Sequence, residues 1–282
     1  NYDLYNEAPA TGVSIGGYDI SEASFLQSFS VSAQETAPKG VFFKPDGTKM
    51  YVCGNTGDDV NEYDLSTAWD VSTASFLQNF SVASQSIYPT ELFFKPDGTK
   101  MYVTDLVDDE VNEYDLSTAW DVSSASFLQN FSVASQETSP YGLFFKPDGT
   151  KMYVTGSGSS SINEYDLSTA WDISSASYLQ NFSVSAQDTG PVGLFFKLDG
   201  TKMYVIGYGG DAVYEYDLST AWDVSTASFL QNFSVATQDT FPFSVFFKPD
   251  GTKMYIVGLT EAIYEYDIPL AATLDTGSFA SG

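Results

Sequence analysis

The sequence predicts an all-β protein, a five-bladed β-propeller with four antiparallel strands in each 51-residue blade. An eleven-residue run at 42–52 recurs with few changes, and each copy reads as a hairpin whose two apolar runs flank a Pro-Asp-Gly turn. Two further short runs of β-formers complete each repeat. Four antiparallel strands repeated radially describe a propeller. The later copies of the run begin 51 residues apart at Phe93, Phe144, Phe195 and Phe246.

Each repeat is predicted to hold its four strands in a fixed order. In the first, residues 25–31 alternate β-formers with polar residues, and a polar link ending near Pro38 leads into the hairpin. A Gly- and Asp-rich loop then precedes a strand at 60–65, and residues 66–75 cross to the next repeat. The hairpin strands are apolar on both sides, which is typical of strands covered on both faces. A β-solenoid is the competing repeat fold, but its repeats are usually shorter and lack such hairpins.

Counting strands predicts how the ring closes. The chain opens with a lone outer strand at 24–31 and ends with three strands at 243–268, which together complete a fifth blade. This closure hides two sheet edges that would otherwise invite aggregation. The alternative is an open array that closes, or polymerises, with other chains. The predicted division is an N-terminal extension at 1–23, the propeller at 24–268 and a C-terminal tail at 269–282.

The repeat resembles a known family. Its unit Pro-x-Gly-Leu-Phe-Phe-Lys-Pro-Asp-Gly-Thr-Lys-Met-Tyr-Val, followed by a Tyr-Asp strand, is similar to the YVTN/lactonase-type β-propeller repeat over about 245 of the 282 residues. The resemblance implies that the hairpin forms inner strands A and B, that the Tyr-Asp strand is C, and that the Phe-Leu-Gln strand is D, the outermost. Family members commonly have seven blades, and no metal-ligand set of a lactonase can be matched onto this chain.

Composition excludes several classes of function. The chain carries 37 acidic residues against 11 lysines, has no histidine and has a net charge of −26, whereas nucleic-acid binding needs a basic footprint. Ten of the lysines lie in the hairpin motif and are therefore features of the scaffold. No stretch approaches 18 apolar residues, so no membrane insertion is expected. The single cysteine, Cys53, excludes an internal disulfide. A composition rich in Ser, Thr, Tyr, Asn and Gly predicts an extracellular, cell-surface or virion-surface protein.

Comparison among the repeats locates a candidate ligand site. The A–B turns and C–D crossings scarcely vary, whereas variation falls just before strand A and between strands B and C. In a propeller these D–A and B–C loops emerge on one face, and binding residues concentrate on loops held by a rigid scaffold. Drift in unconstrained loops is the competing interpretation. The candidate ligand-binding residues of this variable face are Lys39, Tyr88, Glu91, Tyr141, Tyr208 and Phe243.

A ring of aromatic residues is predicted on the opposite face. It occupies one position of the repeated C–D crossing, and Tyr18 takes the fifth place. Such a ring would suit stacking on sugars or on a neighbouring molecule, but we favour the interpretation that each ring packs beneath its own blade. The other members are Trp69, Trp120, Trp171 and Trp222.

No catalytic residue and no metal site are predicted. The lack of histidine rules out Ser-His-Asp and Cys-His mechanisms and His-ligated metals. Glycoside hydrolases work with carboxylates, but Glu62 recurs in every copy, which suits structure better; Glu91 and Glu261 are the distinctive acids of the variable face. Acidic pairs such as Asp58-Asp59 would suit calcium, yet they lack a recognisable ligand spacing. No cofactor is therefore expected, with calcium as the open alternative.

These observations predict a non-catalytic extracellular propeller that serves as a structural or adhesive binding module, for example a subunit of a surface or filamentous assembly. Its expected partners are other protein subunits or surface glycans, with self-assembly through the tails. A multivalent carbohydrate-binding lectin is the first alternative, and a glycan-active hydrolase is the second.

Overall fold

The repeated Pro-Asp-Gly turn forms a hairpin in every copy. In the computed structural model, which describes residues 17–270, Gly47 adopts a φ of 73° and donates its amide hydrogen to the Lys44 carbonyl at 2.7 Å. Asp46 accepts from the Thr48 amide at 3.0 Å. Where Leu198 replaces proline, Gly200 still has a φ of 74°, so the aspartate and glycine suffice to set this turn.

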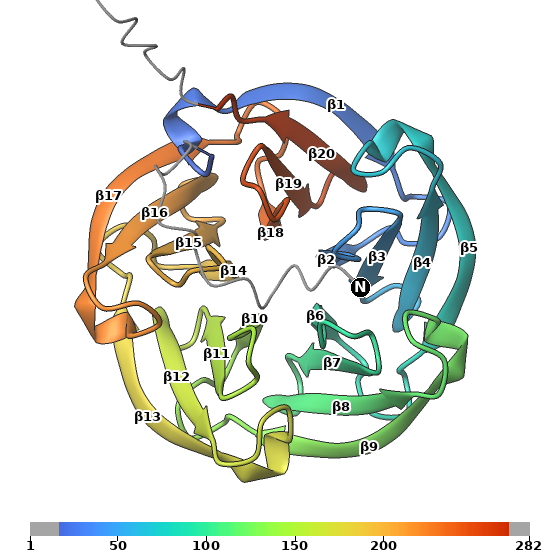
Figure 1. Ribbon diagram of the computed structural model, residues 1–282, viewed down its shortest axis with the longest axis horizontal. Coiled ribbons are helices and arrows are strands. Elements are labelled where there is room, and N and C mark those ends of the chain that lie inside the picture. Colours follow the sequence, from blue (N-terminus) through green and yellow to red (C-terminus); the bar gives the residue numbers. More distant parts are fainter. Residues whose placement is uncertain (1–16, 271–282) are drawn as a thin grey trace, which may run out of the picture.

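Five four-stranded antiparallel sheets surround one axis, and their strands are lettered A to D from the axis outward (Figure 1). Blade I contains β2 (Pro38–Phe43), β3 (Lys49–Gly54), β4 (Asp59–Leu65) and β5 (Ala74–Ser81). Blade II contains β6 (Pro89–Phe94), β7 (Lys100–Asp105), β8 (Glu110–Leu116) and β9 (Ala125–Ser132). Blade III contains β10 (Pro140–Phe145), β11 (Lys151–Gly156), β12 (Ser161–Leu167) and β13 (Ala176–Ser183). Blade IV contains β14 (Pro191–Phe196), β15 (Lys202–Gly207), β16 (Ala212–Leu218) and β17 (Ala227–Ser234). Blade V contains β18 (Pro242–Phe247), β19 (Lys253–Gly258), β20 (Ala262–Asp267) and β1 (Ser24–Ser30).

A 3-10 turn precedes each D strand, because an aspartate caps it. Asp70, for example, accepts from the Ser72 amide at 3.0 Å. The five turns are η1 (Ile20–Glu22), η2 (Val71–Thr73), η3 (Val122–Ser124), η4 (Ile173–Ser175) and η5 (Val224–Thr226).

Blade V closes the ring as predicted. β1, from the beginning of the described chain, pairs antiparallel with β20 from its end, and Figure 1 shows the two strands side by side. Gln27 extends this junction, since its side-chain amide donates to Glu265 at 2.9 Å and to Asp70 of blade I at 2.7 Å. The five-bladed fold and its closure are therefore confirmed, and the solenoid and the open array are excluded.

The tryptophan ring packs within the protein. Trp69 is 8% exposed, stacks on Phe43 with 5.7 Å between ring centroids, and lies against Gly47, where any side chain would collide with the indole. Tyr18 holds the fifth place, with its amide bonded to the Gly251 carbonyl at 2.9 Å. Trp171 is as buried as Trp69, and Trp120 and Trp222 are partly buried. Residues 1–16 and 271–282, which contain most of the predicted extension and tail, lie outside the described residues.

The recurrent strand-C glutamate joins neighbouring blades. Glu62 is buried and accepts from Lys49 at 2.5 Å and from Gln78 at 3.0 Å within blade I. It also accepts from the Val122 amide of blade II at 3.1 Å. This acid therefore holds the scaffold together, which explains why it recurs.

Candidate functional site at the axial mouth

The inner A strands line the axis, and the residues near their N-terminal ends differ from blade to blade. We call the second and third positions of the five A strands the axial mouth. The second positions are Lys39, Thr90, Tyr141, Val192 and Phe243. The third positions are Gly40, Glu91, Gly142, Gly193 and Ser244.

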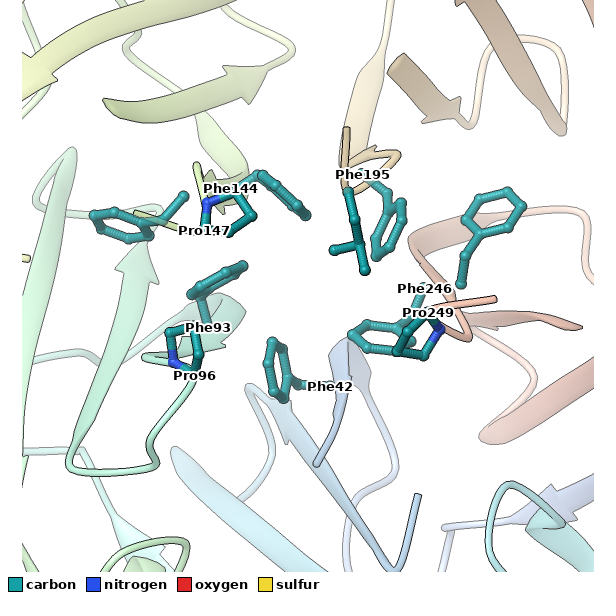
Figure 2. Close-up of a pocket in the computed structure, with 11 residues that line it drawn as sticks. Phe42, Phe93, Pro96, Phe144, Pro147, Phe195, Phe246 and Pro249 are labelled. Atoms are coloured by element: carbon teal, nitrogen blue, oxygen red, sulfur yellow. The ribbon is translucent and has the colours of Figure 1, made fainter. Parts of the chain in front are cut away.

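A ring of identical phenylalanines closes the axis beneath the mouth. Neighbouring rings meet edge to face, with centroids 5.2–5.4 Å apart, and Figure 2 shows them converging on the axis. A cavity of about 20 Å³ lies between this ring and a layer that contains Pro96, Pro147, Leu198 and Pro249. Because the ring is packed, a ligand would have to enter the mouth from the variable face. The five residues are Phe42, Phe93, Phe144, Phe195 and Phe246.

Glu91 is the carboxyl group of the mouth. It is 5% exposed and accepts from the Leu92 amide at 3.1 Å and from the Ser244 hydroxyl at 2.6 Å. Burial raises the pKa of Glu91 to about 8, although these hydrogen bonds and one from the Val41 amide act in the opposite direction. At neutral pH the group is therefore mostly protonated and can donate a proton.

Small neighbours make room for Glu91. A methyl group added at Gly40 would lie 2.5 Å from the Glu91 carboxyl oxygen, so glycine at this position permits the carboxyl to lie there. A second cavity, of about 10 Å³, lies between Glu91, Ser244 and the phenylalanine ring. That volume accommodates about one water molecule.

Lys39 lies in the mouth beside aromatic rings. Its ammonium is 3.4 Å from the centre of the Phe243 ring and 5.8 Å from that of Tyr88, and the residue is 3% exposed. Burial lowers the pKa of Lys39 to about 8, an effect partly offset by Glu35 and Cys53. The side chain of Lys39 therefore changes between its charged and neutral forms close to neutral pH.

The predicted aromatic residues meet at this site. Tyr141 of blade III stacks on Phe243 of blade V, with centroids 6.1 Å apart and planes within 17°. Tyr208 stacks on Phe241 at 4.7 Å, and Phe241 in turn contacts Phe243 at 5.3 Å. Lys39 and Tyr141 thus meet at Phe243, Lys39 also contacts Tyr88, and Tyr208 joins this group through Phe241. Glu91 follows one position later in the A strand than the positions of Lys39, Tyr141 and Phe243.

Sequence reasoning missed Phe241, although a signal existed. Its counterparts in the other repeats are Ala37, Tyr88, Ser139 and Gly190, so this position varies as strongly as those that we selected.

The buried acids that hold the B–C loops were also missed. Glu35 accepts from the amides of Ala37 at 2.7 Å, Thr56 at 3.1 Å and Gly57 at 3.3 Å, and so joins the D–A link to the B–C loop. The signal is an acid recurring at the 51-residue period, in Glu137, Asp188 and Asp239. These carboxylates accept hydrogen bonds from the amides of Gly158, Gly210 and Thr260, so each acid fixes the B–C loop of its own blade to the preceding D–A link.

Across residues 17–270, no group of three or more His, Cys, Asp or Glu side chains is placed to hold a metal ion. Over the same range, no helix is long and apolar enough to span a membrane.

No protein-family model matches the chain, and no curated protein matches its sequence. Among solved structures it is similar to the hydrazine synthase of Kuenenia stuttgartiensis (18% identity, 83% of this chain, 59% of that chain, TM-score 0.51). It is also similar to virginiamycin B lyase from Staphylococcus aureus (12% identity, 88% of this chain, 100% of that chain, TM-score 0.52). The periplasmic gluconolactonase of Pseudomonas aeruginosa matches with 18% identity over 79% of this chain and 64% of that chain, with a TM-score of 0.49. The chain spans about three fifths of the hydrazine synthase and gluconolactonase chains.

At these identities the likeness establishes the fold, and the resemblance to lactonase-type propellers holds at that level. The comparisons correct our functional prediction, however. We predicted a non-catalytic structural or adhesive module and no enzyme, whereas the two neighbours with TM-scores above 0.5 are named as a synthase and a lyase. Adhesion and carbohydrate binding find no support among them. The prediction rested on the lack of histidine and on the recurrence of Glu62 and its counterparts in every repeat.

Proposed function

We propose that the chain is a hydrolase that cleaves a C–O bond of a sugar-derived substrate at the axial mouth, with Glu91 as the general acid. The observation that carries this proposal is the environment of Glu91. The other repeats have glycine or serine at its position, and it is a buried carboxyl whose pKa lies near 8. Buried acids with strongly shifted pKa values concentrate at functional sites.

The chemistry balances with one carboxyl group. Protonated Glu91 gives its proton to the leaving oxygen as the C–O bond breaks, and the resulting carboxylate takes a proton from the water that attacks the substrate. Ser244 and the Leu92 amide already donate to this carboxyl, so they stabilise its ionised form after transfer. The net reaction is addition of water across the bond, and Glu91 ends protonated as it began.

The aromatic residues support binding of a ring-shaped substrate. Tyr88, Tyr141 and Tyr208 are each partly exposed on the variable face, and ligand pockets combine such rings with few polar groups. Because Glu91 is 5% exposed, substrate entry requires side chains of the axial mouth to move. A location outside the cell belongs to this proposal, supported by the acidic, lysine-poor composition.

Glu91→Gln is expected to lower kcat by about 10²- to 10⁴-fold, the usual contribution of a general acid. Hydrolysis would be followed with a panel of 4-nitrophenyl glycosides and aldonolactones. Glu261→Gln is the matched control, since this acid lies in the B–C turn of blade V, where its carbonyl accepts from Val31. Hydrolysis that survives in Glu91→Gln, or no hydrolysis of any probe by the native protein, would refute the proposal.

Stability should fall as pH rises from about 4.5 to about 8. The ordinary pKa of a glutamate is 4.5, so over this window the folded chain keeps on Glu91 a proton that the unfolded chain has released. Removing that proton leaves a buried charge. Glu91→Gln should therefore have a weaker pH dependence than the native protein and a higher Tm at pH 8, measured by thermal unfolding across pH 4–9. Parallel curves for the two proteins would show that Glu91 titrates normally.

A further inference from the structure

Lys39 differs from every other lysine in its surroundings. The ten hairpin lysines each lie within 2.8 Å of an aspartate or glutamate oxygen. Lys39, at 3% exposure the most buried of the eleven, has no ion pair or hydrogen bond from its ammonium to any residue within 17–270. A buried ammonium with no acceptor is costly, so such groups normally find a partner.

Glu35, the acid whose charge acts most strongly on Lys39, does not serve as that partner. Glu35 uses its carboxylate on the amides of Ala37, Thr56 and Gly57, which leaves Lys39 held by Phe243 and Tyr88 alone. Cation–π contacts offset part of the desolvation cost, but an ammonium retains three N–H donors that a ring face satisfies poorly.

We propose that Lys39 binds an anionic oxygen group of the substrate, a carboxylate or a phosphate. This inference rests on the proposed function and specifies its substrate class. Lys39 directly precedes Gly40, where an added Cβ would lie 2.5 Å from the Glu91 carboxyl oxygen. An anion held by the ammonium would therefore be bound in the same axial mouth as Glu91. Tyr88 and Phe243 flank the same ammonium, and the residue is 3% exposed, so an anion would meet it in a site of low polarity, which strengthens the attraction.

Binding to the unreactive Glu91→Gln protein tests this site without turnover. Calorimetric titrations would compare D-glucuronate with D-glucuronamide, and D-glucose 6-phosphate with D-glucose. We expect at least one anion to bind about 10-fold or more tightly than its neutral counterpart, and the preferred pair identifies carboxylate or phosphate. Adding Lys39→Met should abolish the preference. Adding Lys44→Met should not, because Lys44 pairs with Asp46 at the opposite face.

Equal binding of the anionic and neutral compounds, binding of none of them, or a preference that survives Lys39→Met would overturn the anion site. The hydrolase is tested separately: a Lys39-dependent preference together with no hydrolysis by the native protein would retain the anion site and reject the hydrolase.

Thermal unfolding provides a second measurement on Lys39→Met alone. If Lys39 serves ligand binding and not stability, its charge destabilises the ligand-free protein. Replacing it with methionine should then raise Tm by about 2–4 °C. A Tm below that of the native protein would assign Lys39 to the scaffold and overturn the proposal.

Discussion

A chain that begins at Ser32 is expected to lose the native ring altogether. The truncation removes β1, whose residues 24–30 pair with 262–267 of β20, and the buried side chains of Tyr18 and Ile20. It leaves β20 as an unpaired edge between blades IV and I. The loss should exceed the whole stability of a typical domain, about 5–15 kcal/mol, since no repeat replaces the missing strand. Circular dichroism and light scattering should report unfolded or aggregated protein.

A peptide of residues 17–32 provides the control. Added in trans, it should restore the closed ring by strand addition at β20, because it carries the pairing residues and the Gln27 side chain that reaches Asp70. A truncated protein that does not aggregate and unfolds cooperatively at the native Tm would show that closure by β1 is dispensable.

Glu113→Ala is expected to cost about 3–5 kcal/mol of unfolding free energy, as for other buried ion pairs that lose one partner. Glu113 is 1% exposed and accepts from Lys100 at 2.5 Å and from Gln129 at 2.9 Å. It also accepts from the Ile173 amide of blade III at 3.3 Å, so the change leaves buried donors unpaired at a blade junction. Urea unfolding followed by tryptophan fluorescence measures the loss.

Asp115→Ala is the matched control, because Asp115 binds the same lysine at 2.7 Å from a side chain that is 51% exposed. Exposed ion pairs contribute about 0.2–1 kcal/mol, so this change should have a small effect. Equal losses in the two variants would contradict the assignment of Glu113 as a junction between blades.

Local chemistry made the fold predictable. The Pro-Asp-Gly turn, the alternating strands and the aspartate-capped crossings repeat with fixed spacing, and each depends on neighbours within a few residues. Counting those units yields the number of blades and the closure by β1. The tryptophans were foreseen as a ring for the same reason, but their burial depends on contacts such as Trp69 against Phe246 of blade V.

The candidate site was predicted in part. Comparison of repeats selected Lys39, Glu91 and the aromatic residues, because variation among copies marks positions that the shared scaffold does not require. It did not reveal that the pKa of Glu91 is raised, since that shift depends on burial, and it did not find Phe241.

The strands, the turns, the five blades and the face on which the repeats differ can be predicted from the sequence, because they follow from short-range patterns repeated along the chain. Which of the differing residues meet depends on the closed ring. Ring closure brings Ser244 within 2.6 Å of Glu91 across 153 residues and sets Lys39 over the Phe243 ring. Their chemistry arises from that encounter, since exclusion of water at the axis moves the pKa of Glu91 up and that of Lys39 down.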